Sequence, residues 1–424
     1  EQVGVDTIKK IVFVSADIEF IAAIKKIFKF SSFEILNKKK RTFISLKSFV
    51  TNHLFFIKAL VVSLLNIFLK APKGKKYKNL YFTRYPLHFI DGDGGEDKYG
   101  PIDKSSDNFA ISILTDDYHQ KVSILEYMKY KKEVESLDYS LIDSYLKFKD
   151  VFVAYSNSII SIKKWRSVVS NNFIFHGIDI SGYCQNELNF SYNRVTRLLM
   201  WENVFRRYLR KNSCAKFIYY LHEYPYGRLI SYILSAQDFT ESVGMQHGPS
   251  SKRKLVYYLA KNEVSDTNKS YLNHVPIPES ILVEDEYSSL IYSYSNYKNI
   301  IIMPQVTRLS YLDKIKKTKP KYILICPGLH DGPLIIDHVN DEIIFNKEQL
   351  YIIKPHPRAS RRYLSHYDHL NLEIDDRHIS LLLGAAKEVI VTYSSVGMEA
   401  NYLELPVRLI NIPGKISESP LSDG

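Results

Sequence analysis

Cysteine is scarce in this chain of 424 residues, which contains only Cys184, Cys214 and Cys326. An odd number of cysteines at no metal-like spacing indicates neither a disulfide framework nor a zinc site. Free thiols fit a reducing compartment, so we expect a cytoplasmic protein. We also expect no cleavable signal sequence, because the apolar run within residues 9–20 ends in acid and lacks a small-residue cleavage site.

The sequence also lacks an uninterrupted apolar run that is long enough to cross a membrane. Residues 53–70 ("HLFFIKALVVSLLNIFLK") have the length, but a lysine, a serine and an asparagine interrupt them. Basic clusters flank this run at 38–41 and 70–78. The first 80 residues hold 16 Lys and Arg against 5 Asp and Glu, which accounts for the net charge of +11 of the whole chain.

Three interpretations of residues 38–78 compete. A helix buried in the core ranks first, and an interfacial helix whose basic flanks are attracted to an anionic membrane surface ranks second. A nucleic-acid module ranks last, because aromatic and basic residues are not interleaved on a recognisable motif. We therefore expect no nucleic acid among the partners, and any membrane association is expected to be peripheral.

The order of apolar runs indicates an α/β protein with two halves. Strand-like runs alternate with helical periodicity, for example at 192–211 and 227–237, which is typical of parallel sheets with helical crossovers. The predicted strands are 10–16, 79–86, 151–156, 217–223, 241–248, 322–328, 350–357, 388–395 and 407–414. A polar, basic segment at 307–321 separates the halves, so we expect domains at 1–305 and 306–424 with a nucleotide-binding cleft between them.

Residues 350–358 ("LYIIKPHPR") change chemistry abruptly. The first four residues predict a short strand that is buried on both faces. Pro355 and Pro357 then end the strand and restrain the peptides around His356. This histidine would lie at the carboxyl end of a strand, where open α/β sheets bind ligands. A proline-rich strand exit with a solvated histidine is the competing interpretation.

A similar turn follows the next strand candidate. The chain passes through Ser394, Ser395 and Gly397 into a predicted helix that carries Glu399. Hydroxyls and unpaired N–H groups at a helix N-terminus form an anion site, and phosphate is the expected guest. Ordinary N-capping by the serines is the alternative.

The co-occurrence of the two turns favours a ligand site. Lys354 and His356 are expected to approach the same phosphate from the end of the neighbouring strand. Gly328 ends the predicted strand 322–328, and the "HDGP" that follows it is expected to close over the bound ligand. A simple polar turn explains "HDGP" equally well.

These motifs resemble those of known enzymes. "KPHP" followed about forty residues later by "SSVGMEA", with "QHG" upstream, is similar to the bacterial surface-polysaccharide glycosyltransferases of GT-B fold. That group includes capsule Kdo transferases, sialyl- and polysialyltransferases with HP and SS/T motifs, and nonulosonic acid transferases. "RYPLHF", "EDKYG", "YYLHEYPYGRLI" and "GMQHGPSS" are similar in order and spacing to a family known only as surface carbohydrate biosynthesis proteins. The resemblance covers most of the chain from about residue 80.

The resemblance implies a GT-B fold, with two Rossmann-like domains facing each other across a cleft, and a CMP-sugar donor. The HP and SS/T motifs of the resembled sialyltransferases hold the phosphate of the donor. The resemblance therefore implies that His356, with the adjoining Pro357, holds the donor phosphate together with Ser394 and Ser395. Glu399 would bind the ribose hydroxyls. The acidic motif that supplies the base in such enzymes has no clear counterpart in the amino-terminal half, so the base must be sought elsewhere.

Three residues of the amino-terminal half are candidates for the base. Glu223 ends the predicted strand 217–223 before the turn "YPYG", and His247 ends the next strand before a glycine. Asp97 lies in the loop after the strand 79–86. Glycosyl transfer needs a carboxylate or an imidazole near the acceptor hydroxyl. The structural alternatives are a capping or salt-bridging carboxylate, a core histidine and a solvated loop, respectively.

We therefore expect a glycosyltransferase that moves a CMP-activated 3-deoxy-2-keto sugar acid onto a capsule or lipopolysaccharide glycan. The sugar acid would be Kdo or a sialic, pseudaminic or legionaminic acid. Neither a cofactor nor a metal is expected, since a CMP-sugar has one phosphate and the sequence has no DxD arranged for Mg²⁺. The alternatives are a UDP- or dTDP-sugar transferase, a polyol-phosphate transferase of teichoic-acid type, and a non-catalytic glycan-binding assembly protein.

Overall fold

The structure is a computed structural model that describes most of the chain. The described residues are 41–68, 74–86, 89, 98–100, 102–114, 122–169, 174–175, 178–179, 181–220, 222–259, 263–264, 275–304, 309–356, 359–412 and 417–423. Backbone contacts divide the chain into two compact units. The first is Glu1–Pro72 with Ser144–Tyr208, and the second is Lys73–Asp143 with Leu209–Gly424.

The first unit is built on long helices. They are α2 (Arg41–Phe68), α4 (Phe148–Val169) and α5 (Ser181–Lys211), accompanied by a hairpin of β4 (Ile174–Phe175) and β5 (Ile178–Asp179). Helix α2 packs on α4, where His53 Nε2 lies 2.9 Å from the Tyr155 hydroxyl. The guanidinium of Arg197 in α5 lies over the ring of Phe55 in α2. None of the described helices is long and apolar enough to cross a membrane.

Residues 151–156, predicted as a strand, belong to helix α4, so that prediction is wrong. Asp150 accepts a hydrogen bond of 2.8 Å from the backbone N–H three residues earlier, which satisfies a donor at the start of the helix. Val151 and Ala154 are buried whereas Phe152 is exposed, a spacing typical of a helix. A short apolar run does not by itself distinguish a strand from a buried helix.

The second unit contains a seven-stranded sheet in which all paired strands are parallel, in the order β3-β2-β1-β6-β7-β8-β9. The strands are β1 (Lys76–Arg84), β2 (Asp107–Ser112), β3 (Ser140–Leu141), β6 (Ser213–Tyr220), β7 (Glu241–Met245), β8 (Ser280–Val283) and β9 (Asn299–Ile302). The accompanying helices are α3 (Ile124–Ser136), α6 (Pro225–Leu234) and α7 (Glu286–Ser293). Helix α3 begins with a capping box between Ser123 and Glu126.

The same unit contains a five-stranded parallel sheet, in the order β12-β11-β10-β13-β14. The strands are β10 (Tyr322–Cys326), β11 (Leu350–Ile353), β12 (Leu372–Ile374), β13 (Ala386–Val391) and β14 (Val407–Leu409). The helices are α8 (Gly332–Phe345), α9 (Ser380–Leu383) and α10 (Val396–Tyr402). Short 3₁₀ turns complete the described chain: η2 (Ile142–Tyr145), η3 (Leu255–Tyr257), η6 (Leu312–Lys314), η7 (Arg362–His366) and η8 (Pro420–Ser422).

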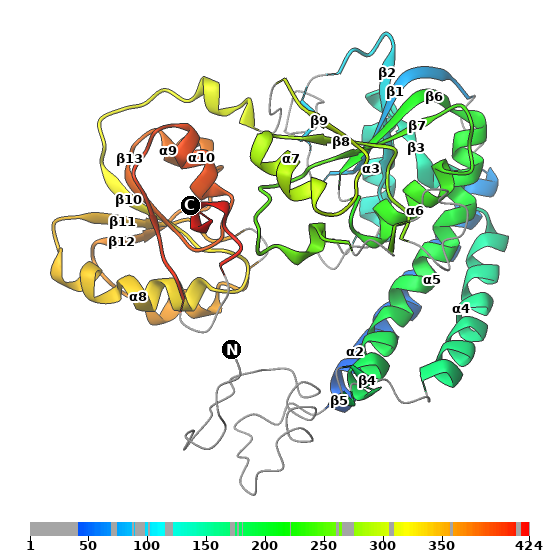
Figure 1. Ribbon diagram of the computed structural model, residues 1–424, viewed down its shortest axis with the longest axis horizontal. Coiled ribbons are helices and arrows are strands. Elements are labelled where there is room, and N and C mark those ends of the chain that lie inside the picture. Colours follow the sequence, from blue (N-terminus) through cyan, green and yellow to red (C-terminus); the bar gives the residue numbers. More distant parts are fainter. Residues whose placement is uncertain are drawn as a thin grey trace, which may run out of the picture. The chain divides into compact units, whose positions relative to one another are not determined.

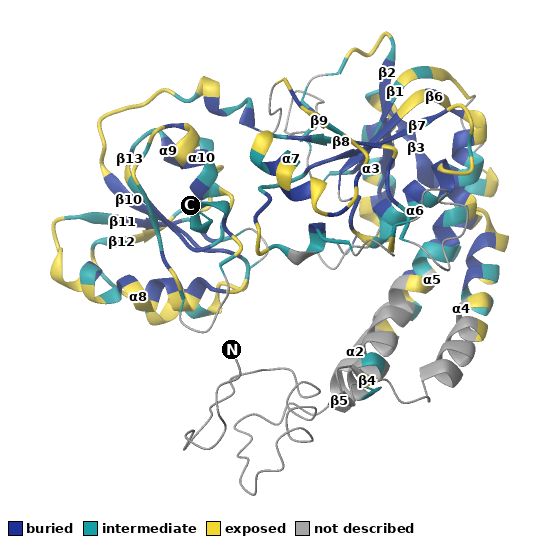
Figure 2. Ribbon diagram, viewed as in Figure 1, coloured by how far each residue is buried: buried dark blue, intermediate teal, exposed yellow. Residues whose placement is uncertain are grey.

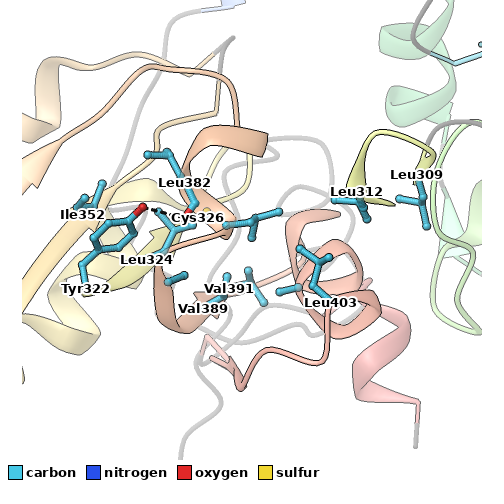
Figure 3. Packing of buried hydrophobic residues seen from close by; sticks show 13 residues of the cluster. Leu309, Leu312, Tyr322, Leu324, Cys326, Ile352, Leu382, Val389, Val391 and Leu403 are labelled. Carbon is cyan, nitrogen blue, oxygen red and sulfur yellow. Dashed lines mark hydrogen bonds between the residues drawn. The ribbon is translucent and has the colours of Figure 1, made fainter. Parts of the chain in front are cut away.

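Alternate residues of β10 enter two cores on opposite faces of the five-stranded sheet. Leu324 packs with Leu382 of α9, and the Tyr322 hydroxyl donates to the Leu382 carbonyl at 2.7 Å (Figure 3). Ile323 and Ile325 pack with side chains of α8 on the other face. Such burial on both faces explains why the apolar run of this strand does not alternate with polar residues. Figure 2 shows the central strands of both sheets as mainly buried.

The predicted α/β class with two Rossmann-like halves is confirmed. The predicted strands 79–86, 217–223, 241–248, 322–328, 350–357, 388–395 and 407–414 correspond to β1, β6, β7, β10, β11, β13 and β14. The helical periodicity at 192–211 and 227–237 corresponds to α5 and α6, and the predicted helix that carries Glu399 is α10. The predicted strand 10–16 lies outside the described residues. The sequence did not indicate β2, β3, β8, β9 and β12. The domain boundary at 305/306 falls between β9 and β10 and stays a prediction, as does the cleft.

Candidate active site

The strand order of each sheet in the second unit reverses at one point. From β1 the chain builds outward to β2 and β3, then returns to β6 on the other side of β1 (Figure 1). In the smaller sheet it goes from β10 to β11 and β12, then returns to β13 on the other side of β10. Open α/β sheets bind ligands outside the carboxyl ends of the strands at such switch points. The expected ligand positions are thus the carboxyl ends of β1 and β6, which form the first switch point, and those of β10 and β13, which form the second switch point.

One carboxylate and two imidazoles form a cluster after β6 and β7. Glu223 Oε1 lies 3.2 Å from His247 Nδ1, and Glu223 Oε2 lies 3.5 Å from His222 Nδ1. The side chains of Glu223 and His222 have no exposed surface, whereas that of His247 is 20% exposed. His247 is therefore the member of this cluster that reaches solvent, and its Nε2 is the ring nitrogen that does not face the carboxylate.

The protonation of this cluster follows from its burial. Burial raises the pKa of Glu223, but the adjacent His222 and the contact with His247 outweigh this effect and hold the pKa below its usual range. Burial lowers the pKa of His222 to about 4. Burial also lowers the pKa of His247, although Glu223 opposes that change. Near neutral pH the cluster thus consists of a carboxylate between two neutral imidazoles, and His247 is able to accept a proton.

Gly244 in β7 makes room for the inner imidazole. A Cβ at this position would lie 3.0 Å from His222 Cγ and 2.7 Å from Pro278 Cγ, which is too close for either atom to stay in place. On its other sides the His222 ring packs against Tyr292 and Tyr297, with ring centroids 5.7 and 5.9 Å away. The first glycine of "GMQHG" is therefore explained by the packing of His222.

The glutamine of the same motif fixes the loop that carries His247. Gln246 Nε2 donates to the Gly248 carbonyl (2.9 Å) and to Ser288 Oγ (3.1 Å), while its Oε1 accepts from the Glu284 N–H (3.0 Å). A side-chain amide both donates and accepts, so one residue ties the loop to α7 and to the end of β8. A Cβ at Gly248 would meet no atom within 4 Å, so packing does not require this glycine.

Part of the "EDKYG" motif lies at the first switch point. The buried Tyr99 hydroxyl donates to the Phe82 carbonyl of β1 (2.8 Å) and accepts from the Tyr220 N–H of β6 (3.0 Å). Lys98 Nζ lies 3.5 Å from the His247 carbonyl oxygen. The motif thus bridges the two central strands next to the imidazole cluster. Asp97, the third candidate base, lies outside the described residues.

A buried cation also stands at this switch point. Arg84 is the last residue of β1 and is 7% exposed, and its guanidinium lies 5.2 Å from the ring centroid of Tyr226. Burial lowers the pKa of Arg84. Arginine nevertheless keeps its charge in proteins, so this side chain contributes positive potential at the strand edge.

Two loops are tied together at the second switch point. The Thr392 hydroxyl, just after β13, donates to the fully buried Asp331 carboxylate, just before α8. The His330 N–H donates to the Tyr393 hydroxyl at 3.2 Å. A Cβ at Gly328 would lie 2.5 Å from Cζ of Tyr393, so the packing of this ring requires the glycine. A donor-binding role of Gly328 stays a prediction.

The two serines after β13 differ in their surroundings. Ser395 is exposed, precedes α10 and makes no side-chain capping bond. Ser394 is half-buried, and its Oγ accepts a long hydrogen bond of 3.4 Å from the Val396 N–H. N-capping, the structural alternative, therefore does not occupy the Ser395 hydroxyl.

Two further predicted donor ligands have structural partners. A Cβ at Gly397 would lie 2.9 Å from Cγ2 of Val391, so this glycine lets α10 pack closely on β13. Glu399 is buried, and its Oε2 accepts a hydrogen bond of 2.7 Å from the Tyr311 hydroxyl. A ribose hydroxyl that binds Glu399 would have to share the carboxylate with Tyr311.

Lys354 and His356 do not lie on the strand next to β13, because β10 separates β11 from β13, so the expectation of neighbouring strands is wrong. Adjacent strands are about 4.8 Å apart, which separates the two strand ends by about 10 Å. Lys354 Nζ lies 3.4 Å from the Asp376 carbonyl oxygen, after β12 and thus on the side away from β13. His356 is half-buried, and its carbonyl accepts from the Ala359 N–H (2.9 Å). Pro357 lies outside the described residues.

Sequence reasoning did not name His222, Arg84, Asp331 or Tyr393 as individual site residues. The first three lie within the motifs "YYLHEYPYGRLI", "RYPLHF" and "HDGP", and Tyr393 directly precedes Ser394. Those motifs and that adjacency were the available signal. Among the residues that the structure describes, no group of three or more His, Cys, Asp or Glu side chains is arranged to hold a metal ion.

No protein-family model and no curated protein sequence matches this chain. Among solved structures it is similar to UDP-GlcNAc 2-epimerase from Neisseria meningitidis bound to UDP-GlcNAc, with a TM-score of 0.42 and 11% identity over 78% of this chain and 81% of that chain. It is also similar to the calicheamicin glycosyltransferase CalG4 (TM-score 0.43, 8% identity, 79% and 80% covered) and to the wall teichoic acid polymerase TagF (0.36, 12%, 89% and 86%). Similarity at this level assigns neither a family nor an activity.

Proposed function

We propose that this protein is a GT-B glycosyltransferase that transfers a CMP-activated 3-deoxy-2-keto sugar acid, of the Kdo or nonulosonic type, to a bacterial surface glycan. The proposal rests mainly on the contact between the Glu223 carboxylate and the His247 imidazole at the switch point of the seven-stranded sheet. A histidine backed by a buried carboxylate is suited to remove a proton from a hydroxyl group. The HP and SS motifs on the second sheet support the choice of a CMP-sugar.

In the proposed reaction His247 is the catalytic base and Glu223 is a positioning residue. The acceptor hydroxyl gives its proton to Nε2 of His247, and its oxygen forms a bond to the anomeric carbon of the sugar acid. The bond from that carbon to the phosphate oxygen breaks, and CMP leaves with the electron pair. Glu223 fixes the ring orientation through Nδ1 and stabilises the imidazolium that forms. Since the Glu223 side chain has no exposed surface, it is not placed to attack the sugar, and the proposed single displacement inverts the anomeric centre.

The donor phosphate would bind at the second switch point. The exposed Ser395 hydroxyl, which makes no capping bond, is suited to donate a hydrogen bond to a single phosphate. His356 would reach the phosphate across the end of β10, over a strand separation of about 10 Å. Lys354 would have to leave the carbonyl of Asp376 to join it. A single phosphate needs fewer counter-charges than a diphosphate, so the proposed reaction uses no metal.

The donor is tested by isothermal titration of the full chain with CMP and, separately, with UDP. We expect CMP to bind more tightly, and we expect Ser394→Ala with Ser395→Ala to weaken CMP binding while Ser360→Ala, an exposed serine of the same half, leaves it unchanged. Tighter binding of UDP would favour a UDP- or dTDP-sugar transferase. Binding of CMP without turnover of any CMP-sugar acid, over a panel of acceptors, would favour a non-catalytic role.

A further inference from the structure

Helix α2 is apolar on two opposite faces. The face that packs into the first unit contains Phe55, Phe56, Ala59 and Val62, all of which are buried. The opposite face carries large apolar side chains with exposed fractions from 45% to 84%, namely Val50, Leu54, Ile57, Leu64 and Phe68. Their spacings of four, three, seven and four residues keep them on one side of an α-helix. The prediction of a core helix therefore describes only one face of α2, because the opposite apolar face is exposed.

A contiguous row of exposed apolar side chains is unusual on a soluble protein surface. Scattered apolar residues are normal, but a continuous patch marks a contact with a protein, a ligand or a membrane. Helix α4 of the same unit also exposes large apolar residues: Phe148, Phe152 and Ile160. Since the rows recur on two helices of one unit, the first unit has a surface that suits an apolar partner.

The positive charge around α2 indicates which kind of partner would cover the exposed apolar row. From residue 35 to residue 90 the sequence contains twelve Lys and Arg and no Asp or Glu. Within α2 itself the charged residues are Arg41, Lys47 and Lys58, all of them basic. At the start of α4, Lys147 and Lys149 flank the exposed Phe148 and are themselves exposed. A partner that covers the apolar row must therefore tolerate, and is favoured by, a high density of positive charge.

We propose that the row formed by Val50, Leu54, Ile57, Leu64 and Phe68 docks the protein on an anionic lipid bilayer, with α2 lying along the surface. Apolar side chains enter the boundary between headgroups and acyl chains, while basic side chains are attracted to anionic headgroups. A second copy of this chain fits less well, because it would bring a segment of the same sign of charge against α2. This inference does not rest on the proposed transferase function.

The docking surface is tested with the full chain and sedimented vesicles of phosphatidylcholine, or of phosphatidylcholine mixed in equal parts with phosphatidylglycerol. We expect binding to the mixed vesicles that weakens as salt is raised, since screening acts on the electrostatic part. The triple variant Leu54→Ser, Ile57→Ser and Leu64→Ser keeps every charge and should lower the partition coefficient about tenfold or more, because apolar burial is lost.

The matched control removes apolar residues of the second unit that are even more exposed. Leu125→Ser with Phe345→Ser, at positions that are 83% and 81% exposed, should bind vesicles like the wild type. The single variant Leu54→Gln, which keeps a good helix former, replaces the triple variant if circular dichroism shows that the latter has lost helix. Its partition coefficient should fall relative to the wild type.

Three outcomes would overturn the proposal. These are absence of binding to the mixed vesicles, binding that the α2 variants leave unchanged, and a concentration-dependent dimer in analytical ultracentrifugation that the α2 variants dissociate. Titration with CMP in the absence of vesicles should give the same affinity for the α2 variants and the wild type. A loss of vesicle binding with CMP binding intact therefore tests the docking surface separately from the proposed function.

Discussion

Replacing Glu223 by glutamine tests whether His247 is the catalytic base and Glu223 the residue that positions it. The substitution keeps the shape of a side chain that has no exposed surface, but it removes the charge that lies 3.2 Å from His247 Nδ1. A hydrogen bond to a charged group contributes about 1.5–3 kcal/mol. If that energy stabilises the imidazolium only in the transition state, kcat should fall about 10- to 150-fold in Glu223→Gln.

The pH dependence of kcat/KM gives the sharper readout. His247 has to be neutral to act as a base, so activity is present above its pKa and is lost as pH falls through that value. Burial lowers the pKa of His247 and Glu223 raises it, so the acid limb of the wild type should lie below pH 6.5, and in Glu223→Gln it should move to still lower pH. Affinity for CMP should not change. Glu241→Gln, at the amino end of β7, is the control and should leave the acid limb unmoved.

Two results would refute this reasoning. If Glu223 is itself the base, Glu223→Gln should abolish the acid limb instead of shifting it, and His247→Ala should retain most of the activity. If CMP affinity falls in Glu223→Gln, the donor lies on the seven-stranded sheet and the two halves have been assigned the wrong way round.

The remaining predictions concern stability and the donor site. His356→Ala should weaken CMP binding by about 1.5–3 kcal/mol in calorimetry and be non-additive with the loss from Ser394→Ala and Ser395→Ala, whereas additive losses would separate the two motifs. Gly244→Ala should lower the free energy of unfolding by about 1–3 kcal/mol in urea titration, because the new Cβ overlaps His222 and Pro278, and unchanged stability would contradict the packing account. Burial raises the pKa of Asp143 to about 6, so its contribution to stability is present below about pH 4 and is lost as pH rises through 6. Relative to Asp143→Asn, the wild type should lose about 2–3 kcal/mol of unfolding free energy between pH 4 and pH 7, and a pH-independent difference would contradict this.

The apolar pattern of the sequence predicts where most of the parallel strands lie and where they end. The apolar runs of β1, β6, β7, β10, β11 and β13 are local signals, because strands buried on both faces need consecutive apolar residues and the turn residues that follow stop them. Glu223 and His247 could therefore be placed at carboxyl strand ends without any structure. Short or polar strands such as β2 ("DNFAIS") and β12 carry weak local signals and were not predicted.

Which strand ends meet, and how deeply each side chain is buried, depends on the folded chain and could not be predicted from the sequence. Strand order depends on pairing between distant segments, so the sequence could not reveal that β10 separates His356 from Ser394 and Ser395. The burial of Glu223 depends on the segments that follow β6 and β7, which carry His222 and His247 and which only the folded chain brings together. The two faces of α2 were likewise indistinguishable in the sequence, because both are apolar and packing alone covers one and exposes the other.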